Sequence, residues 1–160
     1  TDAMSTADLV AARDLSRLID NYYNQPALQK ATRKAVEDND QFYSQFLRFL
    51  QKKGRADSPI SLRNRFLLFY EFAAAAGMRP TVDTLQYQWL CRGMSPSNGM
   101  VEASLWRQSI PTDASLVEGD PDAGEARDAR VWHASIGGVE HWFAFEPGNR
   151  HRAAAVYCRA

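Results

Sequence analysis

The stretch from Ser58 to Gly77 most constrains the fold, because it predicts a long helix that is apolar on two sides. Ser58 suits the N-cap, Pro59 suits the first helical position, and Gly77 can take the left-handed conformation that ends many helices. A helix with two apolar sides must be covered by neighbours, so the sequence predicts a bundle around it. One apolar stripe is Leu62, Phe66, Phe69 and Ala73, and the other is Leu68, Phe72 and Ala75.

The same periodicity predicts further helices before and after this stretch. The first is expected over residues 6–23, and a shorter second helix begins near Pro26. Another helix follows the central one, capped by Thr81 or Asp83 and ending near Gly93. A third helix is expected between Asp40 and Gly54. The sequence therefore predicts about five helices in total.

That third helix carries an aromatic stripe on one face. Packing in the core is the favoured interpretation of the stripe. The alternative is an apolar ligand pocket, but the pattern offers no converging polar groups of the kind that orient a ligand. The stripe consists of Phe42, Phe46 and Phe49.

After Arg130 the period changes to two, which predicts strands. Gly137-Gly138 separates two alternating runs and suits a two-residue hairpin turn. If Ile136 opposes Val139, one face of the hairpin is nearly all apolar and packs on the helices, and residues 151–158 return as a third strand. The other face would then carry His133, Ser135, Glu140 and Trp142.

These patterns predict an α+β, mainly α fold: a bundle of about five helices followed by a small C-terminal antiparallel β hairpin or three-stranded meander. Residues 1–4 are interpreted as a remnant of expression and residues 5–93 as the helical bundle. Residues 94–129 form a loop-rich connection, and residues 130–160 form the hairpin or meander packed on the helices. We expect one domain overall.

Charge and hydropathy exclude several classes of protein. Nineteen basic and nineteen acidic residues cancel, so the chain lacks the basic excess of a dedicated nucleic-acid binder. No apolar run approaches the roughly 20 residues that cross a bilayer, and the N-terminus lacks a secretion signal. We therefore expect a soluble, cytoplasmic protein that binds neither nucleic acid nor membrane.

No motif for catalysis, cofactor binding or metal binding stands out. Cys91 and Cys158 lie far apart, without the spacing of a zinc or iron–sulfur site. His133 and His141 would leave opposite faces of the hairpin, which argues against a shared metal. No Gly-x-Ser-x-Gly elbow and no phosphate-binding glycine pattern is present. We predict no catalytic, cofactor-binding or metal-ligating residue.

Four aromatic residues are candidates for an interface, because aromatic side chains often anchor contacts with partners. Trp106 and Trp142 are the tryptophans least expected to be fully buried, and Tyr22 and Tyr23 end the first helix. Core packing is the alternative for all four.

The order of several motifs resembles a known family. These motifs are Leu18-Ile19-Asp20-Asn21-Tyr22-Tyr23-Asn24, Phe42-Tyr43 with Phe46-Leu47, Phe69-Tyr70-Glu71-Phe72, and Leu85-Gln86-Tyr87-Gln88-Trp89-Leu90. They resemble the C-terminal domain of unknown function 4080, which follows the catalytic barrel in cobalamin-binding radical S-adenosylmethionine (SAM) proteins, often described as Fe-S oxidoreductases. The resemblance spans Leu9 to Leu90. Residues 92–99 depart from it, since they lack a proline-rich, aromatic ending.

The resemblance implies a non-catalytic accessory region that contacts the upstream domains of its own parent chain, covering the barrel or aiding substrate selection. It implies no cofactor in this stretch, whereas the parent would use a 4Fe-4S cluster, S-adenosylmethionine and cobalamin. The alternatives are an independent helical protein–protein interaction module and a small-molecule sensor. Dimerisation through an uncovered strand edge also stays open.

Overall fold

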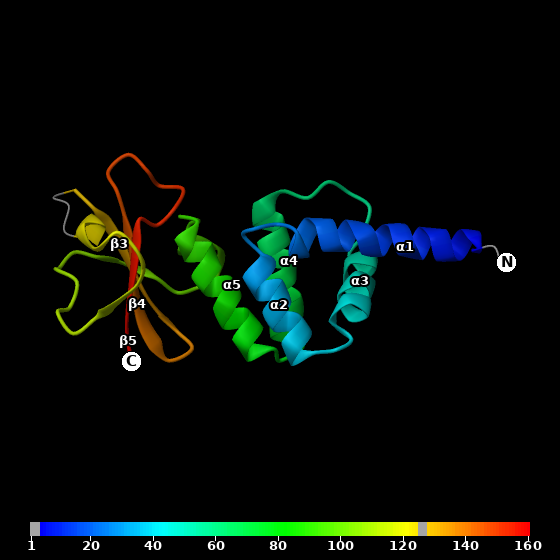
Figure 1. Ribbon diagram of the computed structural model, residues 1–160, viewed down its shortest axis with the longest axis horizontal. Coiled ribbons are helices and arrows are strands. Elements are labelled where there is room, and N and C mark those ends of the chain that lie inside the picture. Colours follow the sequence, from blue (N-terminus) through cyan, green and yellow to red (C-terminus); the bar gives the residue numbers. More distant parts are fainter. Residues whose placement is uncertain (1–3, 125–127) are drawn as a thin grey trace. The chain divides into compact units, whose positions relative to one another are not determined.

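A computed structural model describes residues 4–124 and 128–160 of the chain (Figure 1). This part contains five α-helices followed by a five-stranded antiparallel sheet, which confirms the predicted α+β, mainly α class. It divides into two compact units, one up to Leu85 and the other from Gln86 to Ala160. The number of independently folding domains stays a prediction.

The helical unit contains four complete helices and the first half of a fifth, whose second half belongs to the other unit. A single π-helical turn, Ile19–Tyr23, directly follows the first helix. The helices are α1 (Thr6–Leu18), α2 (Gln29–Asp38), α3 (Phe42–Lys52), α4 (Leu62–Ala75) and α5 (Arg79–Cys91).

The π-helical turn was not predicted from the sequence, which indicated one regular helix over residues 6–23. The backbone N–H of Asn24 donates to the carbonyl of Ile19, five residues earlier, at 2.9 Å. The wider turn changes the direction of the following side chains relative to α1. It accompanies the burial of Tyr22, whose ring meets those of Phe46 and Phe69 edge-on.

Aromatic side chains from α3 and α4 fill the core of the helical unit. Phe46 is fully buried, and its ring centroid lies 5.2 Å from that of Phe69 and 5.0 Å from that of Phe72. Phe42 is also buried, while Phe49 is half-buried against Phe46 and Phe72. The predicted stripe therefore packs in the core.

The ends of α4 were predicted with mixed success. The helix ends as expected, with Gly77 at φ +69° and the N–H of Met78 donating to the carbonyl of Ala73 at 2.9 Å. The predicted cap, Ser58, was wrong. Ser61 is the N-cap, and its hydroxyl accepts a hydrogen bond from the backbone N–H of Asn64.

The second unit is built on one antiparallel sheet with the strand order β1-β3-β4-β5-β2. The strands are β1 (Ser104–Trp106), β2 (Ser115–Gly119), β3 (Arg130–Ile136), β4 (Val139–Phe145) and β5 (Ala155–Arg159). The predicted meander is the centre of this sheet, formed by β3, β4 and β5. The predicted register is confirmed, since Ile136 pairs with Val139 across a turn in which Gly137 and Gly138 both have positive φ.

The segment expected to be a loop-rich connection contributes both edge strands, β1 beside β3 and β2 beside β5. Two short 3₁₀ turns, Pro96–Asn98 and Pro121–Gly124, also lie in it. The expected meander was therefore two strands too small. All residues of β2 are exposed, so the strand lacks the apolar alternation by which a strand is recognised in a sequence.

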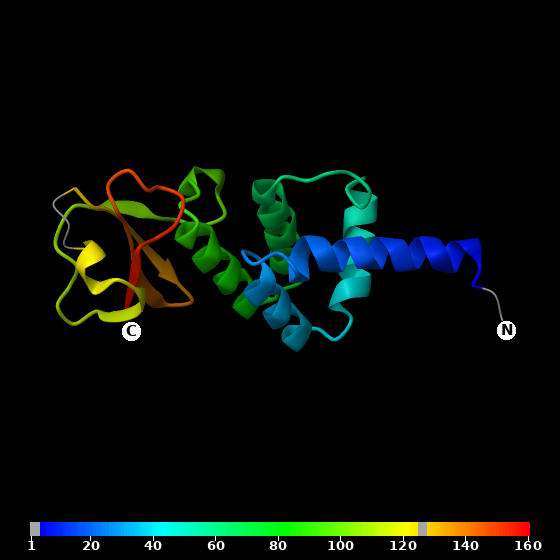
Figure 2. The ribbon, with the colours of Figure 1, turned by 45° about the horizontal axis from the view of Figure 1, so that its top comes forward.

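Both faces of the sheet are covered. On one face, Tyr87 of α5 packs its ring against His141 and Phe143, with both centroid distances 5.5 Å. On the other face, Val131, Trp142, Ala144 and Ala155 form a buried cluster with Ala123 of the second 3₁₀ turn. The chain leads from β1 through the edge strand β2 to this turn (Figure 2).

Among the described residues, no helix has both the length and the apolar character needed to cross a bilayer.

Candidate functional site

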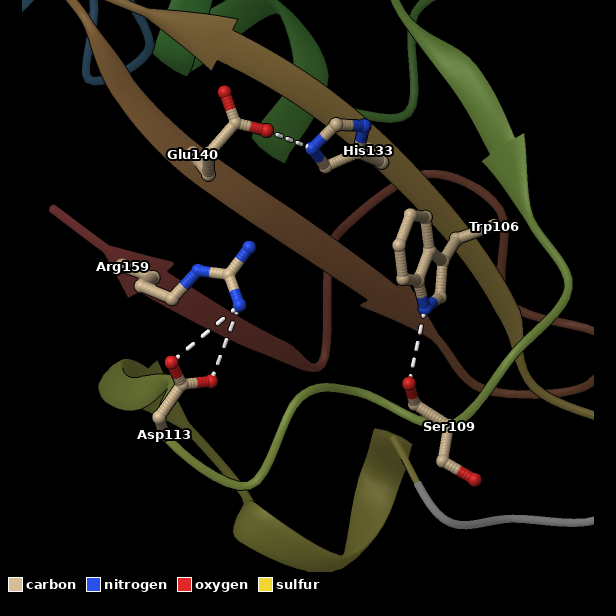
Figure 3. Close-up of polar contacts among 6 residues, drawn as sticks. All are labelled: Trp106, Ser109, Asp113, His133, Glu140 and Arg159. Carbon is tan, nitrogen blue, oxygen red and sulfur yellow. Dashed lines mark hydrogen bonds and ion pairs between the residues drawn. The ribbon is translucent and has the colours of Figure 1, made fainter.

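The second face of the sheet carries a group of aromatic and charged side chains, which we call the polar-aromatic face. Its members come from four strands and the loop after β1 (Figure 3). Register places Trp106 opposite Val131, His133 opposite Trp142, and Glu140 opposite Arg159. Side chains on one face alternate along each strand, so these residues meet. The polar-aromatic face consists of Trp106, Asp113, His133, Glu140, Trp142 and Arg159.

Three aromatic rings form the centre of this face. The ring centroid of His133 lies 5.1 Å from that of Trp106 and 5.2 Å from that of Trp142. The two indoles meet edge-on at 5.7 Å. Trp106 is half-buried and its Nε1–H donates to the carbonyl of Ser109 at 3.1 Å, which fixes the ring against the loop (Figure 3).

His133 and Glu140 form the ionisable pair of this face. The Nε2 atom of His133 meets the Oε2 atom of Glu140, and both side chains keep part of their surface exposed. The hydrogen bond from His133 is the main cause that lowers the pKa of Glu140 below its usual value, and Ser135 and Arg159 act in the same direction. The Glu140 carboxylate is therefore charged at neutral pH.

Arg159 connects the strands to the loop before β2. Its Nη1 atom lies 3.2 Å and 3.4 Å from the two carboxylate oxygens of Asp113 (Figure 3). Its guanidinium also lies 5.4 Å from the ring centroid of Trp142, in cation–π range. Arg159 and Asp113 therefore form an ion pair between β5 and this loop.

A cavity of about 600 Å³ adjoins this face. Its volume is in the range of small-molecule sites, and its lining is mixed, with polar residues such as Arg107, Gln108 and Thr112. Lining residues include Trp106, Ile110, Ala114, Gly124, Val131 and Tyr157.

The described residues contain no group of three or more His, Cys, Asp or Glu side chains close enough to hold a metal ion. Cys91 is a buried free thiol and Cys158 is a partly buried one. The thiol of Cys91 donates a hydrogen bond to a carboxylate oxygen of Glu118, with Sγ 3.6 Å from Oε1. This donor set does not fit a three-cysteine iron–sulfur cluster.

The structure places the four predicted interface residues in two separate locations. Tyr22 is 2% exposed and Tyr23 is half-buried, with the Arg33 guanidinium 5.8 Å from its ring centroid. Trp106 and Trp142 come together on the polar-aromatic face. The expectation that Trp142 would not be fully buried was wrong, since it is 0% exposed beneath Arg159 and Trp106. The interface role of all four residues stays a prediction.

Sequence reasoning missed the pairing of His133 with Glu140 and of Arg159 with Asp113. The first could have been found, because the predicted register puts His133 and Glu140 on the same face as diagonal neighbours. The second depends on the course of a loop and has no signal in the sequence.

Comparison with known proteins gives one family and no individual relative. A search of curated proteins and a search of solved structures found no match. The model of a family described as "Protein of unknown function (DUF4080)" matches residues 1–101. The match therefore includes all five helices and ends before β1, so the polar-aromatic face lies outside it. Because the match covers more than half of the 160 residues, the chain belongs to the DUF4080 family.

Proposed function

We propose that this chain is a non-catalytic accessory region of a cytoplasmic, cobalamin-binding radical SAM enzyme. In this proposal it contacts the upstream catalytic domains of its own parent and covers the barrel or helps to select the substrate. The main support is the first half of α1, which carries exposed apolar residues.

The contrast along α1 is sharp. Asp14 and Leu18 are buried, whereas residues 4–13 are all exposed. Views of the helical unit agree that α1 crosses α3 and continues past it (Figures 1 and 2). Val10 and Ala7 lie four and seven residues before Asp14, so they continue the buried side of the helix toward its N-terminus.

Apolar exposure in this half of α1 is substantial. Leu9 is 55% exposed and Val10 is 43% exposed. A capping box, in which Ser5 and Asp8 exchange hydrogen bonds, stabilises the helix start without tertiary contacts. A preformed helix with an unpaired apolar side suits docking on another domain.

The family membership and the donor set support the same proposal. A radical SAM cluster requires three cysteines, and the chain has two. The 4Fe-4S cluster, S-adenosylmethionine and cobalamin of the proposed parent would therefore be bound outside these 160 residues. What the chain itself contributes is a helical surface and, in its second unit, a covered sheet.

A binding experiment with one charged substitution tests the proposal. The upstream remainder of the parent, with its cluster rebuilt, is titrated calorimetrically with this chain and with Val10→Asp. Burying one valine is worth about 1.5 kcal/mol, and 1.4 kcal/mol corresponds to about tenfold in affinity. We expect Val10→Asp to weaken binding by about tenfold or more.

Val36→Asp is the matched control, because Val36 is an apolar residue that is 39% exposed on α2. It should leave the affinity unchanged. Equal weakening by both variants would contradict docking through α1. No binding of the wild-type chain, with the chain folded and monomeric, would favour the independent interaction module instead.

A further inference from the structure

A small cavity inside the helical unit lies next to the π-helical turn. It is bounded by α1 and this turn, by α3, by the loop before α4 and by α4 itself. The volume of this cavity is about 10 Å³. This is on the order of the roughly 10–15 Å³ that one water molecule needs. Its lining is mixed: Leu18, Leu50 and Ile60 are apolar, whereas Asn21 and Arg55 are polar.

Two hydrogen-bond donors that line this cavity lack partners among the described residues. They are the hydroxyl of Tyr22 and the Nε–H of Arg65, and both atoms are buried. Buried polar atoms in native proteins are nearly always paired with a protein group or with an ordered water. Burial raises the pKa of the Tyr22 hydroxyl well above its usual value of 10.0, and Arg65 partly opposes this. The hydroxyl therefore keeps its proton.

An acceptor lines the same cavity. Asp14 is 7% exposed, and it accepts a hydrogen bond from Arg13 Nη2 at 3.3 Å. The Arg13 side chain is about half exposed. A buried carboxylate offers about four acceptor positions, so one long contact with an exposed guanidinium leaves most of its capacity for another donor.

We propose that this cavity binds one structural water, which accepts hydrogen bonds from Tyr22 Oη and Arg65 Nε and donates one to Asp14. A water accepts two hydrogen bonds and donates two, so it complements two donors and one carboxylate. Three separate elements are joined in this way: α1, the π-helical turn and α4. The π-helical turn contributes Tyr22, which lines the same cavity as Arg65 and Asp14. The water would therefore link this turn to α1 and α4.

The first test is the stability of Tyr22→Phe in the full chain, measured by denaturant titration. A bridged hydroxyl stabilises the fold, so its removal should lower the folding equilibrium constant by about fivefold. Tyr23→Phe is the matched control, because it removes a hydroxyl from the adjacent, half-buried tyrosine. It should change the constant by less than about twofold. A Tyr22→Phe variant as stable as the wild type, or more stable, would overturn the proposal, because an unpaired buried hydroxyl is better removed.

The second test observes the water directly. A high-resolution crystal structure of the wild-type chain should show one ordered water within hydrogen-bond distance of Tyr22 Oη, Arg65 Nε and Asp14. In a Tyr22→Phe crystal this water should be lost or poorly ordered. A dry cavity, or a direct hydrogen bond between Tyr22 and Asp14, would overturn the proposal whatever the stability data show.

A double-mutant cycle with Arg65→Met asks whether both donors share the same water. Shared bonding makes the double variant less destabilised than the sum of the single ones. Strict additivity would contradict a common water.

Discussion

At the scale of single residues, Gly93 is fixed by its backbone neighbours. Its φ is +63°, and a Cβ atom would lie 1.7 Å from the carbonyl oxygen of Arg150. The approach is held by a hydrogen bond from the N–H of Ala153 to the carbonyl of Cys91 at 2.8 Å. We expect Gly93→Ala to lower the free energy of unfolding by about 3 kcal/mol, as measured by denaturant titration.

Gly99→Ala separates the steric effect from the conformational one. Gly99 also has positive φ, +74°, but a Cβ atom added to it would meet no other atom within 4 Å. This variant should cost only about 1 kcal/mol. Equal losses for the two glycines would show that the close approach at Arg150 does not exist in solution.

His141 should make stability depend on pH. Its ring lies against Tyr87 and Phe143, and this burial lowers its pKa below the usual 6.5, partly opposed by its hydrogen bond to the Val139 carbonyl and by Glu140. A lowered pKa in the folded state means that the unfolded chain takes up the proton first as the pH falls. The free energy of unfolding should therefore decrease below pH 6.5.

Denaturant titrations between about pH 7 and about pH 5 measure this decrease. It should become smaller in His141→Phe, which keeps an aromatic ring and removes the ionisable group. His151→Gln should retain the full decrease, because His151 is exposed. A decrease that follows His151 rather than His141 would contradict the assignment to the buried ring.

At the scale of elements, the caps of α1 and α4 use the same chemistry in different settings. Ser5 and Ser61 both accept a backbone N–H at the start of a helix. The start of α1 is exposed, so it can fray without disturbing the core, whereas α4 supplies several core phenylalanines. Ser61→Ala should cost about 1 kcal/mol of global stability.

Ser5→Ala should instead act locally. Hydrogen exchange of the first turns of α1 should become faster, with a change in global unfolding of less than about 0.5 kcal/mol. If Ser5→Ala lowers global stability as much as Ser61→Ala, the first half of α1 must be packed in solution.

Elements with strong local signals were predictable, and those without were not. The β3-β4 register followed from alternation on both sides of Gly137-Gly138. The edge strand β1 has three residues and β2 is wholly exposed, so neither carries a period. The π-helical turn was not indicated by the periodicity of residues 6–23, and in the structure its Tyr22 packs against Phe46 and Phe69. Ser58 and Ser61 are both of a residue type that favours N-caps, and the structure places the cap of α4 at Ser61.

At the scale of the whole molecule, the candidate site was harder to predict than the fold. The sequence singled out Trp106 and Trp142 as aromatic residues, and the structure brings them together. Their charged neighbours are contributed by distant segments: Asp113 and Arg159 meet only when the loop before β2 lies beside β5. Periodicity describes neighbours along one element, whereas this pairing depends on the strand order of the complete sheet.

That strand order also bears on the order of events during synthesis. β2 leaves the ribosome well before β3 and β4, yet the sheet places it beside β5, which is made later. While the β3-β4 hairpin forms, β2 therefore lacks the strand that its backbone N–H and C=O groups pair with. Its exposed residues Leu116 and Val117 then lie on an unpaired strand, and such strands are prone to association. A nascent chain stalled before Ala155 would hold the β3-β4 hairpin without β5, and only the synthesis of β5 would let β2 join the sheet.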